Sequence, residues 1–366
     1  MKILIVRTYP SIMNPEGYNI QEIGMAKALV RQGVTCDVVF YNGKNKDEIK
    51  TIDVKCTDEV KKINVYMLHG FGILKNGFFP GLKKLTKRYD VIQVHEYDQI
   101  TSWLYYTGRK QKVVMYHGPY YHEFNNGYNL KCKVFDNTFL KLRNNKDTLC
   151  FTKSKAAAEF LSRKGFRNTV PIGVGLDTEN FGQIDEEMCD ELKSAFCAGK
   201  ANVVYVGKIE PRRNSLFLAD VMAKTTEINY IVVGDGEKEY VSEFTAKLGD
   251  NVRYITKLSQ SQLKLLYRKA DFMVFPSNYD IFGMVLLEAM FFDLPVISSK
   301  NGGADMLITN GEDGVVLNEF DIKQWVDAIR KMAREQAKDM HEKLIQKDHS
   351  VYTWDGIAKR YLDMLK

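Results

Sequence analysis

The stretch Phe275–Gly303, FPSNYDIFGMVLLEAMFFDLPVISSKNGG, indicates the fold of this chain. It begins where an apolar strand ends, passes through a short polar loop and enters an apolar segment of helical length that opens at Gly283. A second strand, Pro295–Ser298, follows and runs into two glycines. A strand, a helix and a further strand in this order are typical of a βαβ unit, in which a crossover helix joins two parallel strands.

Two carboxylates lie eight positions apart in this unit, Asp280 in the loop and Glu288 in the helix. Ligands of open α/β sheets bind beyond the carboxyl ends of the strands, where Asp280 is expected to lie. We expect free N–H groups of Phe282, Gly283 and Met284 to suit a phosphate there. Glu288 can accept hydrogen bonds from ribose hydroxyls. An ordinary βαβ unit with solvated acids explains the spacing alone equally well.

Length and composition indicate a globular protein of two or three domains. The chain has 366 residues, of which 45% are hydrophobic and 27% charged, and this size allows ample core. Six scattered cysteines without a C-x-x-C pair favour free thiols in a reducing compartment. A strand begins at Lys2, and no apolar run approaches the roughly 20 residues of a membrane span. We therefore expect a cytoplasmic protein without a signal peptide.

The net charge of +6 is unevenly distributed along the chain. Residues 1–180 contain 28 lysines and arginines against 17 acids, whereas residues 181–366 contain 24 against 29. A basic half is suited to anionic lipid, a phosphorylated acceptor or nucleic acid. No recognised nucleic-acid-binding module accompanies the basic residues, so nucleic acid is not an expected partner.

Strands alternate with helices along the whole chain, which predicts an α/β protein with doubly wound parallel sheets. One series of strands starts at Lys2–Val6 and a second at Asn202–Val206. The expected domains are residues 1–178 on the acceptor side and residues 179–349 on the donor side. A helix in residues 350–366 is expected to cross back to the first domain.

The amino-acid sequence of Phe275–Gly303 resembles the donor-site motif of the family-4 retaining glycosyltransferases. These enzymes have the two-domain glycosyltransferase B (GT-B) fold. The family pattern stands here as Pro276-Ser277, Asp280 to Gly283, Glu288-Ala289, Leu294 to Ile297 and Gly302-Gly303. Asp280 replaces a glutamate of the family, and Asp293 replaces a glycine. The resemblance implies two Rossmann-like domains facing each other across a cleft. It also implies a nucleotide-sugar donor, linked to UDP or GDP, and transfer with retention of configuration and without a metal or other cofactor.

The resemblance implies catalytic roles for three residues, His117, Asp280 and Glu288. Asp280 would contact sugar hydroxyls, and Glu288 would hold the ribose or the sugar. His117 ends a strand of the first half, at a place near the sugar in the family. A lone histidine is more often structural than functional. On the resemblance, His117 is nevertheless preferred to the other candidate histidines, which are His69, His95 and His122.

The expected donor site has thirteen members, which are Gly17, Gly207, Lys208, Arg212, Arg213, Lys257, Leu258, Ile281, Phe282, Gly283, Met284, Val285 and Glu288. The resemblance places Lys208 and Arg213 on the donor phosphates, with Arg212 as the alternative to Arg213. Gly17 occupies the position at which the family has two glycines that pack against the donor diphosphate. Lys257 and Leu258 belong to a segment whose backbone contacts the nucleobase. Asn214 and Thr256 stand where glycine is usual.

The expected acceptor is a lipid-linked or membrane-proximal glycan, as in surface polysaccharide assembly. Residues Gly70–Pro80 mix aromatic side chains with a cation, and Lys83-Lys84 and Lys87-Arg88 follow. Such a mixture suits a lipid-linked acceptor or an anionic membrane, to which the protein would bind peripherally. Alternatively, these charged residues only form a helix face in contact with water. Three other functions remain open, which are transfer to a small soluble acceptor, nucleotide-sugar epimerisation and a non-catalytic role as a partner subunit.

Overall fold

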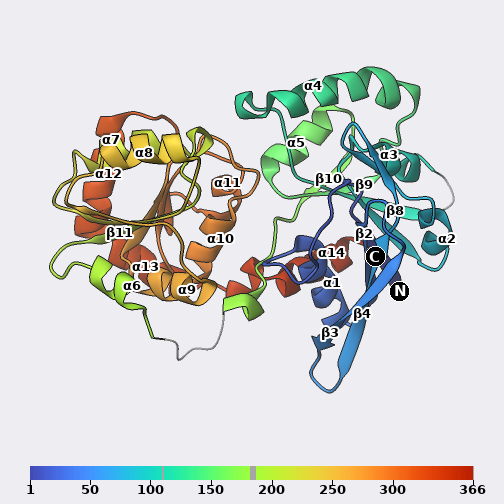
Figure 1. Cartoon of the computed structure of the whole chain (residues 1–366), viewed down its shortest axis with the longest axis horizontal. Coiled ribbons are helices and arrows are strands. Elements are labelled where there is room, and N and C mark those ends of the chain that lie inside the picture. Colours follow the sequence, from blue (N-terminus) through green and yellow to red (C-terminus); the bar gives the residue numbers. More distant parts are fainter. Residues whose placement is uncertain (109–110, 182–186, 366) are drawn as a thin grey trace. The chain divides into compact units, whose positions relative to one another are not determined.

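The computed structural model describes residues 1–108, 111–181 and 187–365, which form two compact units (Figure 1). The described residues of Met1–Asp177 and Ser350–Lys366 form the N-terminal unit, and those of Thr178–His349 form the C-terminal unit. Each unit has its own apolar core and its own sheet, mainly parallel in the N-terminal unit and wholly parallel in the C-terminal unit, as the alternation of strands and helices predicts. The assignment of acceptor and donor roles to the two units stays a prediction.

An eight-stranded sheet in the order β10-β9-β8-β7-β1-β2-β4-β3 forms the centre of the N-terminal unit. Every neighbouring pair is parallel except β3 and β4. The middle strands are almost wholly buried, which is typical of a sheet covered on both faces. The bounds are β1 Lys2–Val6, β2 Thr35–Tyr41, β3 Glu48–Lys55, β4 Val60–Leu68, β7 Val91–His95, β8 Lys112–His117, β9 Leu149–Thr152 and β10 Asn168–Pro171.

One feature of this sheet was not predicted, the antiparallel pair of β3 with nearly the whole length of β4. The apolar run Val65–Leu68 indicated only the buried end of β4. The rest of the pair is mostly exposed. Exposed strands are held by backbone pairing and need no apolar run, so the sequence gives little sign of them.

Helices and a small hairpin complete the N-terminal unit. The hairpin consists of β5 (Phe71–Ile73) and β6 (Asn76–Phe78), which pair antiparallel. Ser154 begins α5 by accepting a hydrogen bond from the backbone N–H of Ala157 at 3.2 Å, as is usual for an N-cap serine. The helices are α1 Gln21–Arg31, α2 Leu82–Thr86, α3 Ile100–Tyr106, α4 Asn126–Phe135, α5 Lys155–Arg163 and α14 Trp354–Leu365.

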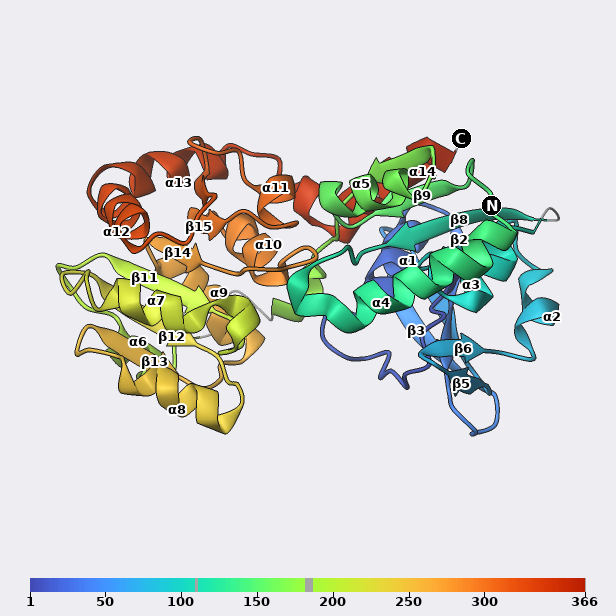
Figure 2. The same ribbon diagram turned by 90° about the horizontal axis from the view of Figure 1, so that it is seen from above.

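Helix α14 belongs to the N-terminal unit although the C-terminal unit precedes it in the chain. It lies along α1 (Figures 1 and 2). A Cβ atom at Gly24 of α1 would overlap the indole of Trp354, so only glycine allows this close approach. Nε of Arg31 donates to Asp355 at 2.8 Å, and the Tyr361 ring packs on Phe151 of β9 at 4.4 Å between centroids. The two ends of the chain sequence thus share one core.

A six-stranded parallel sheet in the order β13-β12-β11-β14-β15-β16 forms the centre of the C-terminal unit. This is the strand order of a Rossmann sheet, in which the order reverses between the first strand and the fourth. Here the reversal lies between β11 and β14. The bounds are β11 Asn202–Val206, β12 Asn229–Val233, β13 Val252–Ile255, β14 Phe272–Phe275, β15 Val296–Ser299 and β16 Gly314–Leu317.

Helices cover both faces of the second sheet, with α7 and α8 on one side and α9 on the other (Figure 1). Trp325 of α12 is fully buried in the core with Tyr205 and Tyr230 of the sheet. The helices are α6 Asp190–Ala195, α7 Ser215–Met222, α8 Lys238–Ala246, α9 Gln260–Lys269, α10 Met284–Phe291, α11 Ala304–Leu307, α12 Ile322–Lys331 and α13 Ala337–Ile345.

Two further findings concern the whole described chain. All six cysteines are free thiols, as their scattered spacing predicts. Among the described residues, no helix combines the length and the apolar composition needed to cross a bilayer.

Candidate active site

The loops that follow β11 and β14 lie at the point where the strand order of the C-terminal sheet reverses. Loops leave such a point toward opposite faces of the sheet, which opens room for a ligand at the carboxyl ends of the strands. We call residues 207–214 and 276–283 together the β11/β14 edge. Asn278 donates its backbone N–H to the Arg212 carbonyl at 3.0 Å, which ties the two loops together.

The backbone around this edge is packed so closely that side chains are excluded at several glycine positions, of which Gly234 is one. A Cβ atom at Gly234, which follows β12, would overlap the carbonyl group of Gly207. Gly207 in turn donates its N–H to the Val233 carbonyl at 3.0 Å. The loops after β11 and β12 are therefore fixed against each other by backbone contacts that require glycine.

Arg213 and Asp280, two of the predicted ligand-binding residues, form an ion pair with each other. Arg213 also lies over the Phe275 ring, 5.0 Å from its centroid, and its Nη1 is 3.4 Å from the Ser277 hydroxyl. Both side chains are largely buried. The family resemblance assigns both charges to the donor and does not indicate that they pair.

Arg212 and Lys208 differ in their surroundings. Nη1 of Arg212 donates to the Tyr279 carbonyl at 3.0 Å, and its Nη2 lies 2.6 Å from a Glu210 carboxylate oxygen. Arg212 thus braces the β14 loop. Lys208 is exposed, and its ammonium has no ionic partner among the described residues. Among the three predicted cations of the β11/β14 edge, Lys208 is therefore the most accessible to an anionic ligand.

The start of α10 differs from the expectation of free N–H groups. The Gly283 N–H donates to Oδ1 of Asp280 at 3.0 Å, so this donor is engaged within the loop and the expectation for it was wrong. The short aspartate side chain thus accepts from the backbone three residues further on, at the residue that precedes α10. Gly283 has φ 74°, a left-handed conformation that suits glycine. Phe282 is buried, and Met284 and Val285 are half-buried.

Glu288 is buried in α10, with 3% of its surface exposed. The hydroxyl of Tyr267 in α9 donates to its Oε2 at 2.9 Å. A buried carboxylate needs such partners to remain stable away from water. Sequence reasoning missed Tyr267, because nothing in its spacing relates α9 to Glu288. At the end of β13, the predicted Lys257 is exposed and Leu258 is half-buried, as is Ile281 in the β14 loop.

Two departures from the family pattern fall on positions with left-handed backbone. Asp293 has φ 62° and Asn214 has φ 55°. Asparagine and aspartate enter this conformation more readily than other residues with a side chain. These substitutions therefore preserve the backbone shape that glycine would provide.

The third predicted catalytic residue, His117, is at the end of β8 in the N-terminal unit and has no exposed surface. Its Nδ1 lies 2.5 Å from Oε2 of Glu96. Its ring stacks on Phe160 at 5.6 Å between centroids, and the Tyr97 ring meets it edge-on at 5.5 Å. Nε2 has no hydrogen-bond partner among the described residues. The ring is thus fixed in place with one nitrogen unengaged.

Glu96 directly follows β7 and is the main charged neighbour of His117. Burial alone would raise the pKa of the Glu96 carboxyl, but His117, Lys153 and His95 together lower it to about 2. Glu96 has φ 61°, a strained conformation for a glutamate. The sequence signal was available, because Glu96 follows the end of β7 as His117 ends β8.

Glu96, Asp98 and His117 are the residues of the described chain that could hold a metal ion, with ligand atoms within 4.8 Å of one another. Burial raises the pKa of the Asp98 carboxyl, and Lys131 lowers it in part. The Lys131 ammonium lies 2.8 Å from Asp98 and would compete with a metal ion for this carboxylate. Transfer without a metal stays a prediction.

The other predicted positions in the N-terminal unit have plain structural settings. His95 is buried, and burial lowers its pKa to about 4 although Glu22 opposes the shift. Gly17 lies in a turn and donates its N–H to the Asn14 carbonyl at 3.1 Å. His69 is exposed, and His122 is half-buried. The role of Gly17 against a diphosphate stays a prediction.

Two family models match this chain, one in each half. Residues 23–180 match the model described as Glycosyltransferase Family 4, and residues 192–350 match the model described as Glycosyl transferases group 1. Between them, the two models span most of the chain.

Curated relatives and solved structures agree with these matches. The chain is 28% identical over 180 residues to an uncharacterized glycosyltransferase of Methanocaldococcus jannaschii, a match that covers 45% of this chain and 44% of the relative. It is 26% identical over 210 residues to a probable sucrose-phosphate synthase of Thermosipho melanesiensis, which covers 53% of this chain and 46% of the relative. The chain thus matches less than half the length of these relatives.

The solved structures are similar over the full length. HepE of Anabaena in complex with UDP has a TM-score of 0.73 at 17% identity and covers 100% of this chain and 99% of its own. A sucrose-phosphate synthase from Thermosynechococcus elongatus has a TM-score of 0.70 at 17% identity, with 100% and 98% covered. At this level of identity the likeness concerns the fold.

Proposed function

Because this chain belongs to the family-4-like glycosyltransferases with the GT-B fold, we propose that it transfers a sugar from a nucleotide-sugar donor to an acceptor hydroxyl. The observation that carries the proposal is the β11/β14 edge, where the strand order reverses and Lys208 is exposed. Solved neighbours in complex with UDP, UDP-glucose or ADP support a nucleoside diphosphate as the carrier. A UDP- or GDP-linked hexose is the proposed donor.

In the proposed reaction, the bond between the sugar and the diphosphate breaks, and negative charge grows on the departing diphosphate. A cation that binds this charge more strongly in the transition state than in the ground state speeds the reaction. Lys208 is proposed to supply that contact. Glu288, held by Tyr267, is proposed to accept hydrogen bonds from the ribose or the sugar.

Asp280 and Arg213 are proposed to exchange partners when the donor binds. In the structure the guanidinium neutralises the carboxylate. A diphosphate is a stronger partner for arginine, because the planar guanidinium binds phosphate oxygens through two hydrogen bonds. The carboxylate released in this way would accept a hydrogen bond from a sugar hydroxyl. His117 is proposed to contact the sugar or the acceptor hydroxyl, and retention of configuration and metal independence belong to the same proposal.

The proposed acceptor is a lipid-linked or membrane-proximal glycan, reached by peripheral binding at the cytoplasmic face of the membrane. The basic N-terminal half supports this choice, because anionic lipid head groups attract clustered lysines and arginines. A lipopolysaccharide outer core galactosyltransferase is also among the structural neighbours, with a TM-score of 0.65. Transfer to a small soluble acceptor is the alternative.

The first experiment is a thermal-shift panel of nucleotide sugars and free nucleoside diphosphates, with slow donor hydrolysis followed by mass spectrometry. One donor that stabilises the protein and is slowly hydrolysed would support the proposal and identify the sugar. Epimerisation of the donor without an acceptor would support the epimerase instead. The absence of a shift with every donor and with UDP and GDP would refute the donor site and leave the non-catalytic role.

A further inference from the structure

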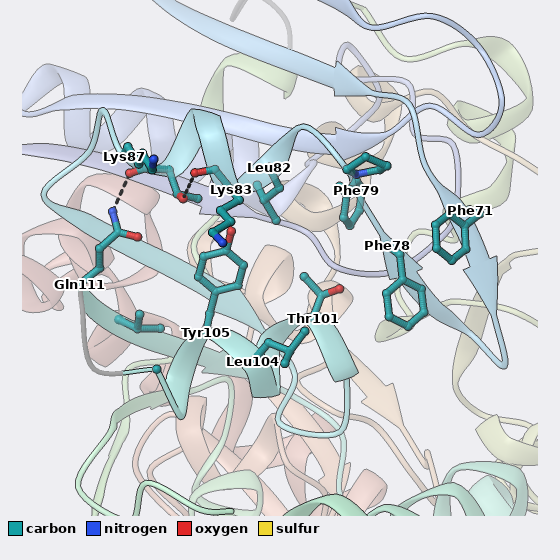
Figure 3. Close-up of a pocket in the computed structure, with 14 residues that line it drawn as sticks. Phe71, Phe78, Phe79, Leu82, Lys83, Lys87, Thr101, Leu104, Tyr105 and Gln111 are labelled. Atoms are coloured by element: carbon teal, nitrogen blue, oxygen red, sulfur yellow. Dashed lines mark hydrogen bonds between the residues drawn. The ribbon is translucent and has the colours of Figure 1, made fainter.

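A cavity of about 850 Å³ opens in the N-terminal unit between the β5–β6 hairpin, α2 and α3, and Val113 of β8 forms part of its wall. Figure 3 shows Phe71 and Phe78 on one side of this pocket and Leu104 and Tyr105 on another. The pocket has the size of a small-molecule site, for which roughly 300–1,000 Å³ is usual. Its lining is mainly aromatic and aliphatic. We call it the hairpin pocket.

The hairpin at its mouth exposes apolar side chains to an unusual degree. Phe71 and Phe78 are cross-strand partners whose rings stack at 5.1 Å between centroids. Ile73 and Leu74 at the tip are 54% and 86% exposed. Leu74 also has φ 47°, a conformation that is costly for a leucine. A polar turn would be more stable in water, so this tip is better suited to an apolar surrounding.

The charges around the pocket have one sign. Lys83 of α2 and Lys87 directly after it line the pocket, and both are exposed, whereas Leu82 is buried. Lys84 and Arg88 are exposed on the same segment. No acidic residue lines the pocket among the described residues. An apolar cavity with a cationic rim is complementary to a hydrocarbon chain that carries an anionic head.

We propose that the hairpin pocket binds the hydrocarbon chain of a lipid phosphate, the carrier of the acceptor, with the phosphate against Lys83 and Lys87. This inference rests on the proposed transferase function, because it names the class of acceptor. A soluble sugar would leave the aromatic walls without a partner. A second copy of the same surface would bring like charges on the two α2 segments together, which opposes pairing of the chain with itself.

Binding of a soluble lipid phosphate to the full chain tests the pocket directly. Farnesyl phosphate, held below its critical micelle concentration, is titrated calorimetrically beside inorganic phosphate and farnesol. We expect farnesyl phosphate to bind, farnesol to bind more weakly and inorganic phosphate not to bind measurably. Equal binding of inorganic phosphate would contradict the proposal that the pocket binds a hydrocarbon chain. A failure of farnesyl phosphate to bind would contradict it as well.

A matched pair of leucine variants tests whether the hydrocarbon chain of the ligand lies in the hairpin pocket. Leu104→Glu places a carboxylate in the pocket wall at a position that is 54% exposed, so folding should not suffer. Leu130→Glu on α4 is the control, since Leu130 is 65% exposed and does not line the pocket. We expect Leu104→Glu to weaken binding of farnesyl phosphate by about tenfold or more. Equal effects of the two variants would overturn the location.

A second pair of variants tests the head group. Lys83→Glu with Lys87→Glu should weaken farnesyl phosphate binding by about fivefold for each lost cation. Lys141→Glu with Lys155→Glu changes the net charge equally at exposed positions outside the pocket and is the control. An equal loss in both double variants would mean that net charge alone attracts the lipid, which contradicts the site.

Two measurements on the same samples separate the inference from the proposed function. A thermal shift with UDP or GDP reports the donor site, which lies in the other unit. A donor shift without lipid binding would refute the hairpin pocket alone, whereas lipid binding without any donor shift would refute the transferase. Sedimentation of the free protein completes the test, because a dimer that Leu104→Glu dissociates would assign the surface to a second copy instead.

Discussion

The β11/β14 edge and the hairpin pocket are built in opposite ways. At the edge, charged groups pair with one another, as Arg213 does with Asp280, and backbone contacts leave no room for a Cβ atom at Gly234. In the pocket, the walls are apolar and the cations of α2 are exposed. A polar ligand that binds Arg213 or Asp280 must exchange existing contacts, whereas an apolar ligand in the pocket would cover surface that is now open. The first arrangement favours selectivity and the second favours affinity for apolar chains.

The largest effect is expected from the one predicted cation of the edge that has no ionic partner. Lys208→Ala should lower kcat/KM for transfer by about 10²–10³-fold, because charge on the leaving diphosphate would lose its contact. Folding should not change, since the side chain is exposed. Lys224→Ala, an exposed lysine after α7, is the control. Unchanged kcat/KM in Lys208→Ala would move the diphosphate role to Arg213 and weaken the contrast between the two regions.

The tight backbone of the edge predicts a loss of stability on adding a single methyl group. Gly234→Ala should destabilise the C-terminal unit by about 1–3 kcal/mol, because the new Cβ atom would meet the Gly207 carbonyl. Gly127→Ala in α4 is the matched change, since a Cβ atom there meets no other atom within 4 Å. That variant should be neutral or slightly stabilising. Urea unfolding measures both, and a neutral Gly234→Ala would show that the edge can relax.

Acid is expected to destabilise the N-terminal unit more than the C-terminal unit, because the buried histidine His95 lies in the N-terminal unit. Burial lowers the pKa of His95 to about 4, below the ordinary 6.5 of the unfolded chain. Between these two values the unfolded chain binds a proton that the folded chain does not, so stability falls as the pH falls. We expect a loss of about 2 kcal/mol between pH 7 and pH 5.

Hydrogen exchange at both pH values, resolved by unit, measures this loss. It should be concentrated in the N-terminal unit, and His95→Gln should reduce it. Equal destabilisation of both units, or the same acid sensitivity in His95→Gln, would contradict the assignment to His95.

The smallest effect concerns the ion pair at the edge. A double-mutant cycle of Arg213→Met and Asp280→Asn should give a coupling free energy of about 1 kcal/mol in the free protein. If donor binding exchanges the partners as proposed, saturating UDP should reduce this coupling. A coupling that UDP leaves unchanged would mean that the pair is only structural, and that Arg212 or Lys208 holds the diphosphate.

The sequence predicted both parallel sheets, because buried strands are continuous apolar runs separated by helices of regular period. It also indicated the order of elements around Asp280 and Glu288. It could not give the partners of these acids, since Arg213 lies 67 positions before Asp280 and Tyr267 lies 21 positions before Glu288. Such pairs depend on how strands are ordered in space, which local spacing does not determine.

The hairpin pocket was predictable only in part. The aromatic and cationic residues of Gly70–Pro80 and the following helix were visible in the sequence, but the cavity was not. Leu104 and Tyr105, which close it, come from α3, beyond the intervening strand β7. The close contact between His117 and Glu96 follows from strand order, because His117 ends β8 and Glu96 directly follows the neighbouring strand β7.

The contact between Trp354 and Gly24 has a consequence for synthesis of the protein. Residues 178–349 leave the ribosome before α14 does, and they can form their own sheet and core while the N-terminal unit still lacks one of its helices. Domains generally fold as units during translation. The nascent N-terminal unit therefore exposes the apolar side of α1 until the second unit has been made. A chain truncated before residue 350 should consequently depend on chaperones even though every strand of both sheets is present.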